Sequence, residues 1–208
     1  MILNGKVINT LLFLSVPTLL VGIIQALIPL SDSLFLNRLT NVQVASSVTF
    51  SQPILNVMIA LSQGLGVATL VMLGRLYGKG RMLAVKETML QIFVFSFIIG
   101  ILIIPVCVFS AFIISKYTTI EIRDNVYIYI SLYSLVMPFV FLAAIYNSSK
   151  NAIGRPEVTF IRIFLLLILK IIFNSIFLYA LKMGITGAVM ASLFLILPLQ
   201  FGCFMTYS

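Results

Sequence analysis

The sequence predicts an all-α membrane protein with six transmembrane helices. Of its 208 residues, 62% are hydrophobic and only 9% are charged, whereas a soluble domain averages roughly 45–50% apolar and about 25% charged residues. The mean hydropathy is +1.21, and the apolar residues form long continuous runs. A water-soluble core has no room for so many apolar side chains, so we expect the lipid bilayer to surround most of the chain.

Six apolar runs can be identified in the sequence. They lie near residues 8–36, 48–74, 88–115, 126–147, 158–181 and 184–207. A spanning helix needs about 20 residues, so each run is long enough to cross the bilayer. The first run is also longer than the roughly 7–15 residues of a signal-peptide core, and we expect it to be retained. The whole chain, 1–208, is therefore predicted to be a single six-helix transmembrane lobe.

Prolines and small residues predict where these helices bend and where they approach one another. A proline inside a run removes a helix hydrogen bond, which predicts a kink. The candidates are Pro17 and Pro29 in the first run, Pro105 in the third and Pro138 in the fourth. Gly64 and Gly66 in the second run predict a close helix neighbour, because small residues allow tight packing in lipid.

The basic residues predict which side of the membrane each connection faces. One side collects Lys6, Arg75, Lys79, Arg81, Lys86, Lys150, Arg155 and Arg162. The other side collects Arg38, Lys116, Arg123 and Lys182. Because Lys and Arg in short loops favour the cytoplasm, we expect a multi-pass protein of the cell membrane with a cytoplasmic N-terminus. The net charge of +8 is then a topology signal, and no nucleic-acid partner is expected.

Two ionisable residues of opposite sign lie well inside the apolar runs. Asp32 is near the end of the first run, and Lys170 is in the fifth. A charge at membrane depth costs roughly 2.5–3.5 kcal/mol on insertion scales, so each of them needs a partner, a bound ion or a change of protonation. Lys170 and Asn174 are four residues apart and therefore share one helix face.

Residues for catalysis and metal binding are scarce. The chain has no His, and Cys107 and Cys203 lie inside apolar runs, where each is interpreted as a small buried hydrophobic residue. We therefore expect no zinc site, no disulfide and no cofactor. The chain also lacks the pattern of nucleophile and base that an active site requires, so an enzyme is not expected.

A series of short motifs follows along the chain. They are Pro17, the Asp32-x-x-Phe35-x-x-Arg38 end of the first run, Pro53, Gly64-x-Gly66, the turn from Asn151 through Gly154 to Pro156, and Gly184-Ile-Thr-Gly187. No single motif is specific. Their order and spacing over nearly the whole chain resemble the N-terminal half of a transporter of the multidrug and toxic compound extrusion (MATE) family.

The resemblance implies a twelve-helix antiporter in which two six-helix lobes, arranged as parallel repeats, face each other across a cleft. It implies export of cationic organic compounds in exchange for inward H⁺ or Na⁺. Only the first lobe is present, so we expect a truncated chain, or one that needs a homodimer partner or a separate second lobe. Lipid-linked sugar flippases and polysaccharide exporters share this architecture and form the alternative, together with an inactive product and a non-transporting assembly factor.

For ion coupling, the resemblance implies four residues of this lobe. Asp32 corresponds to an Asp of the first helix, and Ser192 to a Thr of the sixth. Lys170 and Asn174 stand where many family members have Asn and Asp on the fifth helix. These four residues are the predicted site of cation or proton coupling, and no resident metal ion is expected.

We further hypothesise that the Lys170 ammonium takes the place of the bound cation and pairs with Asp32. A fixed positive charge there disfavours Na⁺ through like-charge repulsion, and coupling then runs through protonation of Asp32. The alternative is that Lys170 extends along apolar surface while Asp32 caps the end of the first helix. The sequence leaves both interpretations open.

Overall fold

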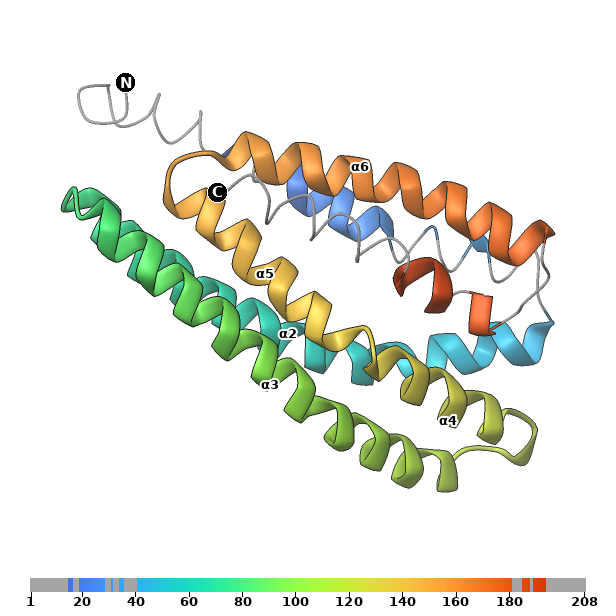
Figure 1. The fold of residues 1–208 in the computed structure, drawn as a ribbon. Helices are drawn as coiled ribbons and strands as arrows, with labels where there is room; N and C mark the ends of the chain where they lie inside the picture. Colours follow the sequence, from blue (N-terminus) through green and yellow to red (C-terminus); the bar gives the residue numbers. More distant parts are fainter. Residues whose placement is uncertain are drawn as a thin grey trace.

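Long helices running back and forth make up the part of the chain that the structure describes (Figure 1). The structure is a computed structural model, and it describes residues 15–16, 19–28, 31, 34–35, 41–180, 185–187 and 189–193, without the side chains of 178–180. Asp32, one of the predicted coupling residues, lies outside the described residues.

Five α-helices and one π-helix have assigned bounds. They are α2 (Val42–Gly78), α3 (Met82–Lys116), α4 (Ile120–Ser134), α5 (Met137–Ala152), α6 (Pro156–Asn174) and the π-helix η1 (Ser175–Ala180). Residues 19–28, 185–187 and 189–193 are also helical. Within the described residues, three helices are long and apolar enough to cross a membrane, or four if the bent pair α4–α5 is one span. The chain is therefore an all-α, multi-pass membrane protein.

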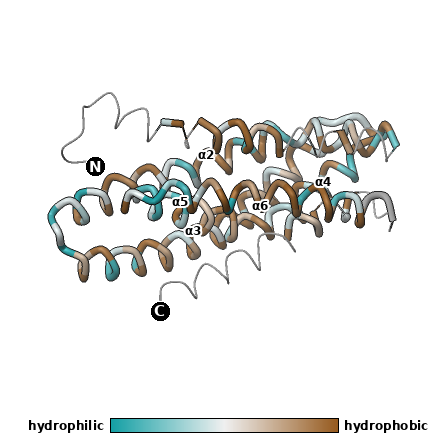
Figure 2. The backbone as a smooth tube through the Cα atoms, turned by 90° about the horizontal axis from the view of Figure 1, so that it is seen from above, coloured by the Kyte–Doolittle hydropathy of each residue, from teal (hydrophilic) through white to brown (hydrophobic). Residues whose placement is uncertain are grey.

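The helices begin earlier than the apolar runs that predicted them. α2 starts at Val42, α3 at Met82 and α4 at Ile120, in each case ahead of the run. Hydropathy marks only the lipid-embedded stretch, whereas a helix satisfies its own backbone hydrogen bonds in lipid and in the interface alike. Figure 2 shows the result, with hydrophobic residues along the helices and hydrophilic ones gathered toward the connections.

The fourth apolar run forms two helices instead of one. α4 and α5 are separated by a short break and bent by 48°. Pro138 lies in the first turn of α5, which agrees with the predicted kink because proline cannot donate a hydrogen bond to the preceding turn. In contrast, α3 continues through Pro105 as one helix.

Glycines let α2 and α3 approach α5 closely. A Cβ placed on Gly100 of α3 would lie 2.5 Å from Cα of Pro138, and one placed on Gly66 of α2 would lie 2.8 Å from Oγ of Ser148. A Cβ on Gly64 would meet nothing within 4 Å. The predicted close packing of the second run therefore occurs at Gly66 and not at Gly64.

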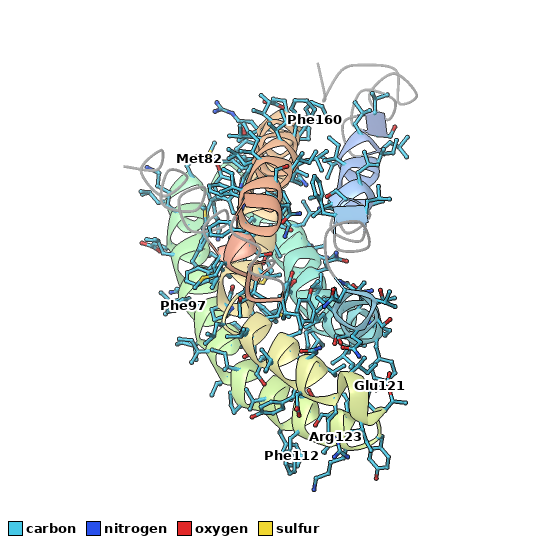
Figure 3. The ribbon with its side chains drawn as sticks, turned by 90° about the vertical axis from the view of Figure 1, so that its right-hand side faces the viewer. Met82, Phe97, Phe112, Glu121, Arg123 and Phe160 are labelled. Atoms are coloured by element: carbon cyan, nitrogen blue, oxygen red, sulfur yellow. The ribbon has the colours of Figure 1, made fainter. Side chains whose placement is uncertain are left out.

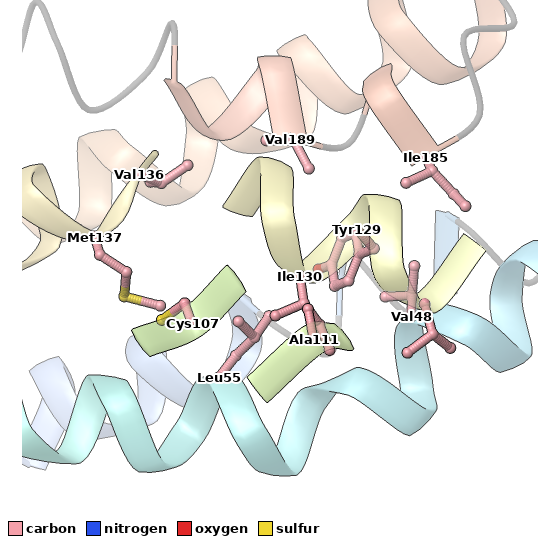
Figure 4. Packing of buried hydrophobic residues seen from close by; sticks show 11 residues of the cluster. Val48, Leu55, Cys107, Ala111, Tyr129, Ile130, Val136, Met137, Ile185 and Val189 are labelled. Carbon is pink, nitrogen blue, oxygen red and sulfur yellow. The ribbon is translucent and has the colours of Figure 1, made fainter. Parts of the chain in front are cut away.

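The apolar core joins α2, α3, α4 and the start of α5 to the helical residues that follow 184 (Figure 4). Its members are Val48, Leu55, Cys107, Ala111, Val126, Tyr129, Ile130, Val136, Met137, Ile185 and Val189. Cys107 is fully buried among them, as its interpretation as a small hydrophobic residue predicts. Because Ile185 and Val189 belong to the core, the segment that carries Ser192 is packed onto the bundle.

The connections after α2 and after α5 share one backbone design and lie at the same end of the bundle (Figure 1). Gly80 has φ +70° and Gly154 has φ +75°, values that favour glycine. In each turn the next residue donates back to the last turn of the helix, Arg81 N–H to Leu76 O at 3.2 Å and Arg155 N–H to Lys150 O at 3.0 Å. These bonds satisfy carbonyls that a helix end leaves without a helical partner.

The opposite end of the bundle holds the connection between α3 and α4. Figure 3 labels Arg123, Phe112 and Glu121 at this end of the bundle. Nε of Arg123 donates to Ser115 O at 3.0 Å and its Nη2 to Lys116 O at 3.1 Å. Arg123 thus caps the last carbonyls of α3, where a positive charge also complements the helix dipole.

Replacing Gly100 with alanine is expected to destabilise the bundle, because the new Cβ must push α3 away from Pro138. Overpacking of this kind costs about 1–3 kcal/mol. The matched control is Gly64→Ala, which enters open space and is expected to be neutral or to gain up to ~1 kcal/mol of helix propensity. Thermal unfolding in detergent, followed by circular dichroism, compares them. Equal melting temperatures would contradict the close approach at Gly100.

Replacing Gly80 with alanine is expected to strain the turn after α2, since a side chain in the left-handed region costs roughly 1–2 kcal/mol. Gly78, two residues earlier, is helical and has equally open surroundings. Gly78→Ala is therefore the control and is expected to be neutral or slightly stabilising. The same unfolding measurement applies, and a Gly80→Ala variant as stable as Gly78→Ala would show that the turn does not need its glycine.

Candidate functional site

Lys170 points into the bundle from α6. Its Nζ donates a hydrogen bond to Oγ of Ser192 at 2.6 Å. Both side chains are buried, with 5% of Lys170 and 3% of Ser192 exposed. The bond joins the fifth apolar run to the sixth, and it brings together two of the residues that the sequence proposed for ion coupling.

Asn174 lies on the same face of α6 as Lys170. Its side chain is 1% exposed, as expected for a residue one turn further along a buried face. The α-helix ends at Asn174 and continues as the π-helix η1 from Ser175. Such widened turns are rare and occur frequently at functional sites. The hydrogen-bond register of the fifth run therefore changes next to the candidate site.

This site holds a buried cation, a hydroxyl that accepts its hydrogen bond and an amide on the same helix face. A lysine ammonium offers three donors and no acceptor, while a serine hydroxyl both accepts and donates. A charge in such a place needs compensation from a nearby group of opposite sign. The acid predicted for that purpose, Asp32, lies outside the described residues. The pairing of Asp32 with Lys170 and the roles of all four residues in coupling stay predictions.

No group of three or more His, Cys, Asp or Glu residues with the composition of a metal site occurs among the described residues.

Sequence reasoning missed a second buried polar cluster, near the start of α6. Arg162 and Lys150 were counted only as topology signals, and just 6% of Arg162 and 7% of Lys150 are exposed. Arg162 Nη1 donates to Oδ1 of Asn147 at 2.7 Å. Thr159 and Arg162 are three residues apart and both buried, so their spacing was the signal that marked one polar helix face.

The chain is similar to known transporters in sequence and in fold. A family model described as MatE matches residues 17–176. A search of curated proteins finds no match. Among solved structures, an outward-facing multidrug resistance MATE family transporter of the MOP superfamily matches with a TM-score of 0.84 and 21% identity, over 91% of this chain and 42% of the other.

Two further structures show the same relationship. A MATE structure in the straight conformation matches with a TM-score of 0.84 and 21% identity, over 93% of this chain and 43% of the other. A MOP superfamily transporter from Pyrococcus furiosus, described as having a binding pocket of reverse polarity, matches with a TM-score of 0.83 and 21% identity, over 91% and 42%. The chain thus spans less than half the length of the transporters whose fold it shares.

The bond between Lys170 and Ser192 is expected to appear as a coupling in a double-mutant cycle. Ser192→Ala removes an acceptor from a buried charged donor, which costs about 1–3 kcal/mol. In a Lys170→Met background the same change is expected to cost almost nothing. Lys170→Met itself replaces the ammonium by an apolar side chain of similar length, and its own cost cancels in the cycle.

The measurement is the melting temperature of the four proteins in one detergent, with a coupling free energy of about 0.5–3 kcal/mol expected for residues in contact. Additive effects would mean that the bond contributes nothing to stability.

Proposed function

This chain belongs to the MatE family, and on that premise we propose that it forms the N-terminal six-helix lobe of an antiporter. The transporter exports cationic organic compounds in exchange for H⁺ or Na⁺. The family match and the shared fold support this proposal. Because the chain spans less than half of such a transporter, the proposal includes a second lobe, supplied by a continuation of the chain, a second copy or a separate partner.

The observation that carries the proposal for coupling is the buried Lys170 ammonium, held by Ser192. A cation that is part of the chain repels a second cation at short range. The site thus favours H⁺ over Na⁺ as the coupled ion. In the deprotonated state the Asp32 carboxylate pairs with the ammonium. When Asp32 takes up a proton the ion pair is lost, and Lys170 retains its hydrogen bond to Ser192.

The orientation in the membrane follows from the two ends of the bundle. The end with the α2–α3 and α5–α6 connections carries most of the described basic residues, among them Lys79, Arg81 and Arg155. We propose that this end faces the cytoplasm, since short basic loops favour that side. The candidate coupling site on α6 then lies toward the outer half of the membrane.

The test is a reciprocal charge swap in cells that lack their own efflux pumps. Four forms are compared: the wild type, Asp32→Lys, Lys170→Asp and the double variant. Wild-type cells are expected to accumulate less ethidium than vector cells. A protonophore should abolish this difference, whereas replacing external Na⁺ by K⁺ should not. Each single change is expected to lower the efflux rate at least about tenfold, because breaking a buried pair leaves one charge uncompensated, and the swap should restore part of it.

The chain is expressed both alone and as two copies joined by a flexible linker. Such a linker is possible because both termini are predicted to be cytoplasmic. Lys86→Asp, a charge reversal at an exposed position, is the control and should keep wild-type efflux. A swap no better than either single change would refute the pairing of Asp32 and Lys170. Vector-level accumulation by the wild type in both formats would rule out a second copy of the chain as the second lobe.

A further inference from the structure

Two buried basic side chains converge on one aromatic ring between α5 and α6. Nζ of Lys150 lies 5.4 Å from the centroid of Tyr146, and Cζ of Arg162 lies 5.3 Å from the same centroid. Both cations are more than nine-tenths buried, with 7% and 6% exposed. Contacts of cations with an aromatic face are favourable. Two like charges at the same ring, however, repel each other, and an anion bound close to both relieves that repulsion.

Hydrogen bonds fix the orientation of the arginine. Arg162 Nη1 donates to Oδ1 of Asn147 on α5 at 2.7 Å. Thr159, one turn earlier on α6, donates from Oγ1 to Oδ1 of Asn151 at 3.1 Å, and its hydroxyl also lies 3.3 Å from the carbonyl of Asn147. These bonds tie α6 to α5 and hold the guanidinium in place. A planar guanidinium with five donors matches the oxygens of a phosphate group.

The charge balance at this end of the bundle favours an anionic ligand. Of the five acidic residues in the chain, only Glu87 and Glu157 belong to the helices that start here, and both are exposed. Glu157 precedes Arg162 by five residues, so it projects from a different face of α6. Basic side chains are in clear excess at this end, as Arg75, Lys79, Arg81, Lys86 and Arg155 show.

The depth of the cluster matches the phosphate layer of a membrane. Arg162 is six residues from the start of α6, about 9 Å at 1.5 Å per residue. Lys150 is two residues from the end of α5, about 3 Å by the same rise. The polar layer on each side of the hydrocarbon core is about 5–7 Å thick. The long side chains of both residues therefore bring their charges to the level of the headgroups.

We propose that Lys150, Arg162 and Tyr146 form a binding site for a phosphate group. The phosphate belongs either to the headgroup of an anionic membrane lipid or to a free phosphate ion. Binding places negative charge close to both cations and clamps the start of α6 to the end of α5. The site lies at the opposite end of α6 from Lys170, and it does not depend on the transport function proposed above.

The test measures the melting temperature of the 208-residue chain in a zwitterionic detergent free of phospholipid. One arm adds inorganic phosphate against sodium chloride of equal ionic strength. The other arm adds phosphatidylglycerol against the same amount of phosphatidylcholine. A ligand that binds only the folded state raises the melting temperature in proportion to its occupancy. A rise in the first arm identifies a free phosphate site, and a rise confined to the second arm identifies a lipid headgroup site.

The matched variants are Lys150→Met and Lys86→Met. Lys150→Met keeps an aliphatic stem over Tyr146 and removes the charge, and it is expected to weaken binding at least about tenfold, as the loss of a charge-assisted contact implies. Lys86 is exposed at the same end of the bundle, and Lys86→Met should bind as the wild type does. Arg162→Lys keeps the charge without the planar fork and should bind more weakly than the wild type.

Two results would overturn the proposal. One is a wild-type melting temperature that neither phosphate nor phosphatidylglycerol raises. The other is an equal loss of the shift in Lys86→Met and Lys150→Met, which would identify general surface charge as the cause. The first result needs no variant, so it decides the question even where a substitution prevents folding. A lower melting temperature of Lys150→Met without ligand, accompanied by a full wild-type shift, would assign the cluster a structural role and equally refute the site.

Discussion

The cost of an unpaired polar group in apolar surroundings governs this structure. An α-helix avoids this cost for its backbone, because its N–H and C=O groups form hydrogen bonds within the same segment. Hydroxyl groups inside the helices also find partners locally. Ser51, Thr69 and Ser149 each donate a hydrogen bond to a carbonyl four residues earlier. Lys170 and Arg162 cannot be satisfied in this way, because their long side chains carry charge away from their own helix. Each reaches another helix, and both bonds fix how α6 is placed in the bundle.

The features that depend on local sequence could be predicted. Continuous apolar runs indicated membrane-spanning helices, because long apolar stretches with few charges are typical of such helices. Pro138 indicated the bend between α4 and α5, because the backbone donor that proline lacks is a property of the local sequence. The family resemblance placed Lys170 and Ser192 in one site, although they are 22 residues apart, and the hydrogen bond between them was not predicted. Neither periodicity nor spacing alone connects those two residues.

The features that depend on packing between distant segments could not be predicted. Gly64 and Gly66 are alike in sequence, and only the position of α5 shows that Gly66 is the one at a close approach. Gly100 offered no signal, because its role comes from Pro138, which is distant in the chain and adjacent in space. Arg162 was counted only as a topology signal, and its burial could not be predicted. Its burial depends on Asn147 and Tyr146, which α5 brings alongside.

The two buried cations make α6 the element that connects both ends of the bundle. Arg162 and Lys170 are eight residues apart on one continuous helix, about 12 Å along its axis. A phosphate bound at its first turns, as proposed above, would restrain the helix that carries the candidate coupling site. Any such coupling is reciprocal, because a ligand at one end changes affinity at the other by the same factor that it experiences in return. The change to a π-helical register directly after Asn174 lies about one turn beyond Lys170 on the same segment, so the backbone pattern changes beside the residue whose charge the proposed coupling depends on.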